Sequence, residues 1–371
     1  MIIGVPKEIK NHEYRVSTLP SGIEALIKHG HKVYVQSGAG DGTGISDEDY
    51  ANAGAEILSS AKQVFEKAEM IVKVKEPQES EYPMIRKGQI VFTYFHFAAS
   101  KELTAAMLNK EIVAIAYETI MLPNGTLPLL TPMSEVAGRM AIQEGARYLS
   151  KPAGGIGILL AGVPGVPPAK VVIIGAGVVG INAAKVAAGM GAIVTVLDVN
   201  IDKLRFIDDT LPANVRTLFS NPHTLRRAVK DADLVVGAVL VAGAKAPVLI
   251  TRALLREMKP GTVIVDVAVD QGGCVETTRP TTHENPVYIE EGIVHYCVAN
   301  MPGAVPKTSS YALANATFPY LMEIANKGYI KSGRENQAIA RGINMVEGTL
   351  TNAEVAQAFN LKYTEIQKVL W

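Results

Sequence analysis

The sequence has few of the features that mark several classes of protein. Its two cysteines, Cys274 and Cys297, lack the spacing of redox or metal sites, and we expect buried, reduced thiols. No uninterrupted apolar run approaches the ~18 residues that a membrane-spanning helix needs. The opening MIIGVPKEIK has no apolar signal-peptide core. We therefore expect a soluble protein of the cytoplasm without a membrane partner.

An excess of charge of one sign is also missing. The chain has 36 Lys and Arg against 36 Asp and Glu, a formal net charge of zero. Bulk electrostatics therefore favours neither a nucleic acid nor a membrane surface as a partner. No internal repeat or low-complexity tract interrupts the 371 residues, of which 48% are hydrophobic and 19% charged. This length and composition predict two globular domains, each with its own core.

One stretch, Val171–Asp198, has the pattern of a dinucleotide-binding unit. An apolar strand leads into Gly175, Gly177 and Gly180, which form G-x-G-x-x-G, and an alanine-rich helix and a second strand follow. Gly175 permits the tight turn, Gly177 lets the backbone approach a pyrophosphate, and Gly180 lets helix and strand pack closely. The helix N-terminus offers N–H donors and partial positive charge to the phosphates.

The acid at the end of the second strand indicates which dinucleotide is bound. Asp198 lies roughly 20 residues after the glycines, the spacing at which an acid bonds the adenosine ribose. Its carboxylate would repel a 2′-phosphate, so we predict NAD(H) over NADP(H), although Lys203 and Arg205 could soften the repulsion. The alternative is a glycine-rich turn without a ligand. The strand, helix and acid around the motif favour the ligand.

Residues 1–127 alternate between strand and helix patterns. The apolar strand patterns lie at Ile2–Val5, Lys32–Gln36, Met70–Lys75, Gln89–Phe95 and Ile112–Tyr117, and helical spacing lies at Leu19–His29, Asp47–Ala55, Ala61–Ala68 and Lys101–Leu108. This alternation predicts a βαβ domain with a largely parallel sheet. It has no glycine-rich phosphate loop, and we interpret the glycine-dense segment 38–44 as a surface loop.

The rest of the chain predicts a second α/β domain and a helical tail. A helix opened by Ser134 and Glu135 is expected to bridge the domains, and later strands are expected at Leu234–Val239, Thr262–Val267 and Ile293–Cys297. After Met301 we expect helices and no strands, in a tail that covers the first sheet.

The fold class predicted is therefore α/β, with two Rossmann-like domains, largely parallel sheets, a cleft between them and a helical C-terminal tail. Residues 1–128 with 306–371 would form the substrate (catalytic) domain, and residues 129–305 the NAD-binding Rossmann domain.

Polar residues at predicted strand ends indicate a site, because ligands of parallel sheets bind there. Lys75 and His96 end strands of the first domain and Arg15 follows its first strand. In the second domain Asp270 ends the strand pattern TVIVDVAVD, and Asn300 follows the strand pattern IVHYC. Arg15 and Lys75 suit a small carboxylate. His96 can move a proton near neutral pH, and Asp270 could orient it, take a proton or stabilise a cation. Each residue alone is more often only solvated or packed, but their joint placement favours a site.

Several segments closely resemble bacterial L-alanine dehydrogenases. They are GVPKEIKNHEYRVSTLP, VKVKEP, FTYFHFA, TPMSEVAGRMA, GAGVVG, VDVAVDQGGC and VANMPGAVPKTSSYAL, and the similarity covers essentially the whole chain. The first and last segments are also shared with the NAD-binding α subunit of proton-translocating transhydrogenase and, more distantly, with saccharopine dehydrogenases.

This resemblance implies an oxidoreductase that converts L-alanine, water and NAD⁺ reversibly to pyruvate, ammonium and NADH. The implied substrate residues are Arg15, Lys75, Tyr94, Met133 and Asn300, with His96 and Asp270 as the acid/base pair. The implied NAD contacts are Ser134, Gly175, Gly177, Val178, Val179, Gly180, Asp198, Lys203, Ser220, Val239, Leu240, Val267, Ala268, Val269, Asp270, Arg279, Val298, Ala299, Asn300 and Met301.

The resemblance also implies a homo-oligomer, typically a homohexamer, whose first domain includes the C-terminal tail. Some members of the family hold a metal between a Glu and a His on the tail helix. Here Glu323 is present but Lys327 stands where the His would be, so we predict no metal. Two alternatives stay open: a non-catalytic NAD(H)-binding module like the transhydrogenase subunit, and a dehydrogenase of another small 2-amino or 2-oxo acid.

Overall fold

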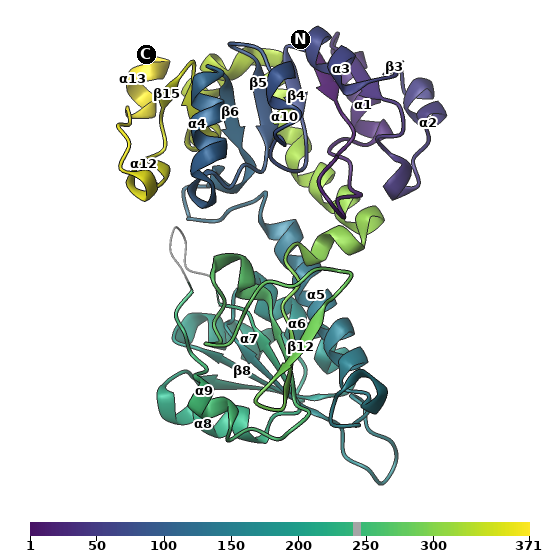
Figure 1. The fold of residues 1–371 in the computed structure, drawn as a ribbon, viewed down its shortest axis with the longest axis vertical. Helices are drawn as coiled ribbons and strands as arrows, with labels where there is room; N and C mark the ends of the chain where they lie inside the picture. Colours follow the sequence, from purple (N-terminus) through teal and green to yellow (C-terminus); the bar gives the residue numbers. More distant parts are fainter. Residues whose placement is uncertain (240–245) are drawn as a thin grey trace. The chain divides into compact units, whose positions relative to one another are not determined.

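A computed structural model describes residues 1–239 and 246–371 and divides the chain into two compact units. Unit 1 is Met1–Met133 with Gly303–Trp371, and unit 2 is Ser134–Pro302 (Figure 1). Both chain termini therefore lie in unit 1. The expected cleft between the units and the roles assigned to them stay predictions.

Unit 1 is built around an eight-stranded sheet in the order β15-β14-β6-β5-β4-β1-β2-β3. Its strands are β1 (Ile2–Val5), β2 (Lys32–Gln36), β3 (Glu56–Leu58), β4 (Met70–Val72), β5 (Ile90–Thr93), β6 (Val113–Ala116), β14 (Ile343–Val346) and β15 (Thr349–Leu350). Strands β1 to β6 pair in parallel. The chain begins in the middle of this sheet, extends it in one direction to β3, and then crosses back to β4. The strand order therefore reverses between β1 and β4.

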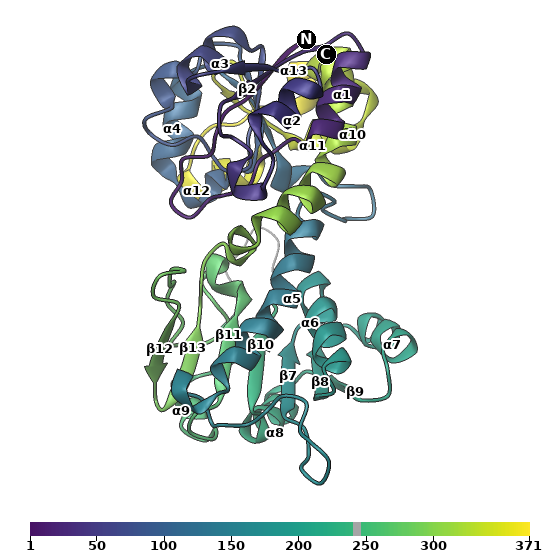
Figure 2. The ribbon, with the colours of Figure 1, turned by 90° about the vertical axis from the view of Figure 1, so that its right-hand side faces the viewer.

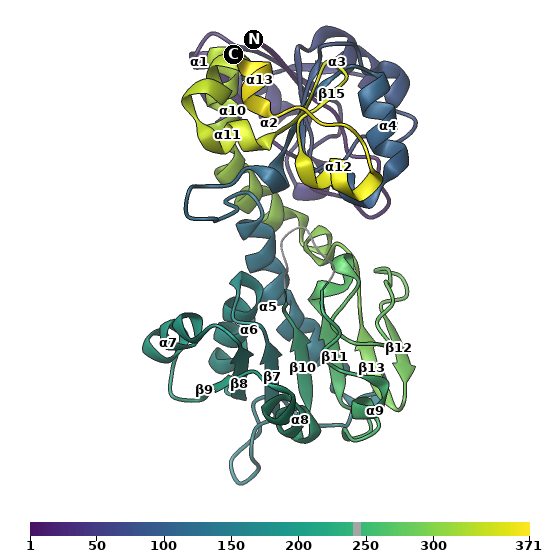
Figure 3. The ribbon, with the colours of Figure 1, turned by 90° about the vertical axis from the view of Figure 1, so that its left-hand side faces the viewer.

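Helices cover both faces of this sheet. They are α1 (Pro20–Lys28), α2 (Asp47–Asn52), α3 (Ala61–Lys67), α4 (Lys101–Asn109), α10 (Pro306–Glu335), α11 (Gln337–Gly342), α12 (Ala353–Phe359) and α13 (Ile366–Leu370), with short 3₁₀ turns η1 (Asp41–Thr43), η2 (Tyr82–Met84), η3 (Phe97–Ala99) and η4 (Tyr117–Thr119). Side chains of α3, α4 and α12 form one core with the sheet. The helices α1, α10, α11 and α13 lie on the other face (Figures 2 and 3). The C-terminal helices thus pack on unit 1.

The expectation of a tail without strands is wrong. Strand β14 pairs antiparallel with β6, and β15 pairs with β14 to form the edge of the sheet. The four-residue run of β14 has Asn344 in its middle, and a run this short gives no reliable strand period. Asn344 is nevertheless buried and donates to Thr119 Oγ1 at 2.7 Å, so the tail also braces η4.

The segment 38–44 is only in part a surface loop. Gly40 is buried, and a Cβ there would meet the Ile45 carbonyl oxygen at 2.5 Å. The segment forms η1 and leads to Ser46, which caps α2 in a capping box with Asp49. Its glycines therefore serve close packing as well as turning.

Unit 2 has a seven-stranded sheet in the order β12-β13-β11-β10-β7-β8-β9. Its strands are β7 (Lys170–Ile174), β8 (Ile193–Asp198), β9 (Val215–Phe219), β10 (Leu234–Gly237), β11 (Val263–Asp266), β12 (Val287–Glu290) and β13 (Ile293–Tyr296), and its helices and turns are α5 (Thr131–Tyr148), α6 (Val178–Gly189), α7 (Ile201–Thr210), α8 (Pro222–Asp231), α9 (Arg252–Leu255), η5 (Lys151–Ala153), η6 (Val267–Gln271) and η7 (Met301–Ala304). All pairs are parallel except β12 with β13. The order again reverses, between β7 and β10. This is the doubly wound topology whose ligands bind at that point.

Two expectations about the whole chain can be compared with the structure. Cys274 and Cys297 are free and buried, as expected. Among residues 1–239 and 246–371, no helix has the length and apolar character needed to cross a membrane.

Candidate functional site

In unit 1 the predicted substrate residues gather beyond the carboxyl ends of β1, β4 and β5. Arg15 lies in the loop after β1, Lys75 shortly after β4, and His96 shortly after β5. These three strands are neighbours in the sheet. Strands β4 and β5 are shorter than predicted, so neither Lys75 nor His96 is itself a strand end. The reversal of strand order between β1 and β4 nevertheless brings Arg15 and Lys75 to one place.

Arg15 is held in a fixed orientation by a buried carboxylate. Its side chain is only 2% exposed, and its Nε and Nη2 donate to the two Glu13 oxygens at 2.7 and 2.6 Å. Its Nη1 lies 3.0 Å from the Met133 sulfur. Burial acts to lower the pKa of Arg15, but Glu13 outweighs burial and raises it. The guanidinium is therefore a permanent, oriented cation.

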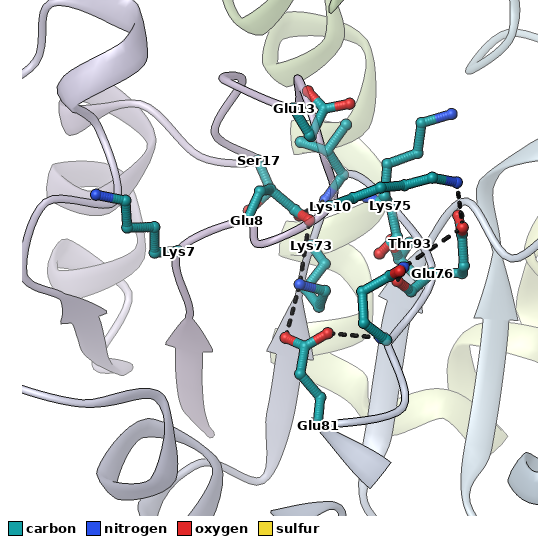
Figure 4. A network of polar contacts seen from close by, with 12 residues as sticks. Lys7, Glu8, Lys10, Glu13, Ser17, Lys73, Lys75, Glu76, Glu81 and Thr93 are labelled. Carbon is teal, nitrogen blue, oxygen red and sulfur yellow. Dashed lines mark hydrogen bonds and ion pairs between the residues drawn. The ribbon is translucent and has the colours of Figure 1, made fainter. Parts of the chain in front are cut away.

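Lys75, unlike Arg15, is not held by a carboxylate within the described residues. Its Nζ contacts no acceptor within the described part of the chain, and its ammonium points away from the neighbouring ion pairs (Figure 4). Burial lowers the pKa of Lys75, and the positive charge of Arg15 lowers it further. A half-buried ammonium beside a guanidinium is the arrangement that an anionic ligand would stabilise.

A buried ion network that the sequence analysis missed lies next to Lys75. The ammonium of Lys73 is fully buried and contacts Glu8 at 3.1 Å and Glu81 at 2.9 Å (Figure 4). Glu8 also accepts the N–H groups of Val74 at 2.6 Å and Lys75 at 3.3 Å, which fixes the backbone at the site. The signal was the lysine inside the apolar strand pattern MIVKVK, because a buried lysine needs a carboxylate partner.

His96 has an unusual backbone conformation. Its φ of 53° and ψ of 41° lie in the left-handed region, at the start of η3. Its exposed imidazole stacks on the Tyr94 ring at 5.8 Å with an interplanar angle of 9°. Tyr94 is buried, its hydroxyl donates to the Leu129 carbonyl, and burial raises its pKa. The ring that supports His96 is therefore anchored at its far end.

In unit 2 the glycine loop has the geometry that the motif predicts. Gly175 has a φ of 108°, which an L-residue with a side chain rarely adopts. A Cβ on Gly180 would lie 1.8 Å from the Gly175 carbonyl oxygen, whereas a Cβ on Gly177 would have no described atom within 4 Å. Gly177 is also the N-cap of α6 and has no side chain to satisfy the first N–H groups. The loop thus leaves open space and N–H donors together, which suits a pyrophosphate.

Asp198 ends β8 beside this loop and also braces it. One carboxylate oxygen accepts the Ala176 N–H at 2.6 Å, and the other accepts the Asn200 N–H at 2.8 Å. Lys203 is exposed on α7, and Arg205 pairs with Asp202 at 2.6 Å. Asp198 thus lies at the strand end beside the glycine loop, where a ribose-binding acid is expected.

Most other predicted NAD contacts follow strand ends of the same sheet. Ser220 follows β9, Val239 follows β10, Val267–Asp270 form most of η6 after β11, and Val298–Met301 follow β13. Arg279 is exposed and lies over the Tyr288 ring at 4.2 Å, while Ser134 lies on α5 at the edge of unit 2. Leu240 falls outside the described residues.

The expectation that Asp270 ends a strand is wrong. Strand β11 ends at Asp266, and Asp270 is an exposed residue of η6. Asp266 is 1% exposed and accepts the N–H groups of Ala268 at 3.1 Å and Cys274 at 2.9 Å and the Thr278 hydroxyl at 2.6 Å. Asp266, which the sequence analysis did not single out, therefore fixes the turn that presents Asp270.

Asn300 shares the backbone feature of His96. Its φ is 61°, and its carbonyl oxygen lies 3.4 Å from His283 Nε2. Non-glycine residues in this region are uncommon, and they cluster at functional sites.

The Glu323 carboxylate on α10 contacts one lysine and one side-chain amide. Lys327 contacts Glu323 at 3.0 Å and Glu335 at 2.9 Å, and the Asn336 amide donates to Glu323 at 2.9 Å. Over the described ranges no three His, Cys, Asp or Glu side chains gather as a metal site would need. The lysine ammonium thus lies where a cation would be expected, and the absence of a metal stays a prediction.

Comparison with known proteins identifies the family. Residues 4–137 match the family described as alanine dehydrogenase/PNT, N-terminal domain, and residues 141–353 match the corresponding C-terminal domain. The chain is 57% identical to the alanine dehydrogenase of Methanococcus maripaludis and 54% identical to that of Staphylococcus saprophyticus, over all 371 residues and the full length of both.

Two solved structures are similar as well. An L-alanine dehydrogenase matches with a TM-score of 0.94 and 50% identity, over 97% of this chain and 99% of the other. A transhydrogenase from Sinorhizobium meliloti matches with a TM-score of 0.81 and 25% identity, over 95% of this chain and 99% of the other. With both domain models and full-length relatives in agreement, the chain belongs to the alanine dehydrogenase/PNT family.

Proposed function

We propose that this protein is an NAD-dependent alanine dehydrogenase, which interconverts L-alanine and pyruvate with release or uptake of ammonium. The observation that carries the proposal is the pair of cations at the strand reversal of unit 1. Arg15 is oriented by Glu13, and the Lys75 ammonium contacts no acceptor among residues 1–239 and 246–371. Together they suit the carboxylate of a small 2-amino or 2-oxo acid.

Two features of unit 2 support NAD as the cofactor. The open space at Gly177 and the N–H groups at the start of α6 fit a pyrophosphate. The Asp198 carboxylate suits the ribose hydroxyls and disfavours a 2′-phosphate. When bound, NAD supplies the acceptor for the hydride that leaves the substrate Cα.

The residues of unit 1 then have separate tasks. Arg15 and Lys75 fix the carboxylate, so the substrate Cα has one position. The imine formed by oxidation must add water and expel ammonia, and both steps move protons. We assign these transfers to the His96 imidazole, with Asp270 as the second acid/base group and Tyr94, Met133 and Asn300 around the substrate.

The first test is whether the purified chain alone forms NADH from NAD⁺ and L-alanine. A panel of small amino acids, including glycine and serine, identifies the preferred substrate. Turnover with another amino acid at a higher kcat/KM would favour the alternative of a different small-acid dehydrogenase. No turnover with any amino acid, together with tight NADH binding, would favour the non-catalytic transhydrogenase-like module.

The second test addresses His96. His96→Ala should lose roughly 10² to 10⁴ in turnover, the usual contribution of a general acid/base. NADH affinity should stay unchanged, because the proposed NAD contacts lie in unit 2. Near-normal turnover of this variant would overturn the assignment of His96.

We also propose that the protein forms a homo-oligomer, a homohexamer by family resemblance, and acts in the cytoplasm. Light scattering on the purified protein measures the number of chains. A monomer that has full activity would overturn this proposal.

A further inference from the structure

The backbone of His96 is held by a carboxylate from the neighbouring strand connection. Glu118 lies in η4, the turn after β6, which pairs with β5 along its whole length. Its Oε1 accepts the His96 N–H at 2.6 Å. Both Glu118 oxygens also lie 3.2 Å from the Phe95 N. Two consecutive N–H groups therefore converge on one carboxylate.

This contact matters because the conformation of His96 is unfavourable by itself. The left-handed region costs a residue with a Cβ free energy, and it persists only where the surroundings enforce it. A hydrogen bond from a backbone N–H to a charged carboxylate is among the stronger kinds, and here it is short. Glu118 thus provides the interaction that compensates for the strain at His96.

The turn at His96 also sorts the neighbouring rings into two stacks. Phe95 and Phe97 are buried and stack on each other at 4.4 Å, whereas His96 stacks on Tyr94. If residue 96 relaxed to an extended conformation, its ring would leave Tyr94 and the Phe95–Phe97 pair would separate. The position of Glu118 is itself fixed, because Asn344 of β14 donates to the adjacent Thr119.

We propose that Glu118 is a positioning residue, which holds the His96 imidazole in its working orientation by fixing the backbone of Phe95 and His96. This inference rests on the proposed role of His96 in proton transfer. Glu118 acts through His96, since its carboxylate contacts the backbone N–H groups of Phe95 and His96.

The first measurement compares three substitutions of Glu118. Glu118→Ala should lower kcat by about 10- to 100-fold, the size expected when a reacting group is misplaced by about 1 Å. The KM for L-alanine and the affinity for NADH should change by less than about threefold, because Arg15, Lys75 and unit 2 are untouched. Glu118→Gln keeps one acceptor oxygen and should recover most of the lost kcat. The kcat of Glu118→Asp should lie between those of Glu118→Ala and Glu118→Gln.

The matched control is Glu102→Ala. Glu102 is an exposed carboxylate on nearby α4 that contacts the Ser100 hydroxyl and no part of His96. Its kcat should stay within about twofold of the parent protein. If Glu118→Ala does not fold, Glu118→Asp provides the test, and its kcat must fall below the values of both Glu102→Ala and Glu118→Gln.

A double-mutant cycle separates positioning from general stability. In a His96→Ala background, Glu118→Ala should change the residual kcat by less than about twofold. The same fold-loss in both backgrounds, or a normal kcat for Glu118→Ala alone, would overturn the positioning role. Near-normal kcat for His96→Ala alone would instead overturn the proposed function of His96, so the two failures are distinguishable.

Discussion

Two buried carboxylate sites, one in each unit, have different kinds of partner. Unit 1 pairs Glu8 and Glu81 with Lys73, and Glu13 with Arg15, so each buried carboxylate contacts a cation. Unit 2 surrounds Asp266 with two backbone N–H groups and a hydroxyl, all of them neutral donors. Within the described residues, the first arrangement orients the Arg15 guanidinium and fixes the backbone at Lys75, and the second supports a turn of backbone.

The pKa directions reflect this difference. Burial acts to lower the pKa of Lys73, but its two carboxylate partners outweigh burial and raise it. Burial raises the pKa of Glu8, which shares that single cation with Glu81. Burial likewise raises the pKa of Asp266, and its neutral donors only partly oppose the effect. A carboxylate can thus be buried with either kind of partner, with different effects on the pKa values of the groups involved.

The largest effect is expected from breaking the ion network of unit 1. Lys73→Met should lower the free energy of unfolding by about 3 to 5 kcal/mol, because it leaves Glu8 and Glu81 buried without a cation. Urea denaturation followed by circular dichroism measures the change. The control is Lys62→Met, which removes an exposed i,i+4 pair and should cost at most about 0.5 kcal/mol. Equal losses in the two variants would contradict the role of burial.

The corresponding change in unit 2 should cost less. Asp266→Asn keeps the size of the side chain but presents an NH₂ group to donors, and should destabilise the protein by about 1 to 3 kcal/mol. Because the pKa of Asp266 is raised in the folded state, ionisation of this side chain disfavours folding, so Asp266 contributes most to stability at low pH and less as pH rises through that pKa. The loss measured for Asp266→Asn by urea denaturation should therefore be larger at low pH and smaller above the pKa of Asp266, since Asn does not titrate. A loss of unfolding free energy as large as that of Lys73→Met would contradict the expected difference between these two buried sites.

A substitution in the glycine loop can test NADH binding without changing the stability of the fold. Gly177→Ala should weaken NADH binding by about 10- to 30-fold, or about 1.4 to 2 kcal/mol, because its Cβ enters the space open to a pyrophosphate. The Tm should not change, since that Cβ meets no described atom. Gly189→Ala at the other end of α6 is the control, with open space and no expected effect on NADH. Fluorescence titration with NADH measures both, and unchanged affinity in Gly177→Ala would remove the loop from the site.

The smallest effect concerns the pH range over which the charged Lys75 would bind the substrate carboxylate. The lowered pKa of Lys75 means that its positive charge is lost at a lower pH than that of an ordinary lysine. The KM for pyruvate should therefore rise a few-fold as the solution becomes alkaline, by loss of one charge–carboxylate contact. Lys75→Arg stays charged and should give a flatter profile. Profiles of the same shape in both proteins would contradict a titrating Lys75.

Much of the site was predictable because it depends on local pattern and on one rule of parallel sheets. The three glycines, the following helix and Asp198 lie in one continuous stretch, so their spacing alone predicts their arrangement. Arg15, Lys75 and His96 were found from the rule that ligands bind beyond strand carboxyl ends. The predicted strand ends were too long by two or three residues, and that error did not move the residues to another edge of the sheet.

What escaped prediction depends on contacts between distant parts of the chain. Glu118 reaches His96 from the next strand connection, and Lys73 meets Glu8 from the first strand connection. The tail strand β14 joins β6 only because the sheet already exists. The sequence by itself thus determined two α/β units, a glycine loop and the strand-end residues, since periodicity and motif spacing are local. Only the tertiary structure decided which carboxylates hold Lys73 and the backbone of Lys75 and His96, because long-range packing selects among many possible charged partners.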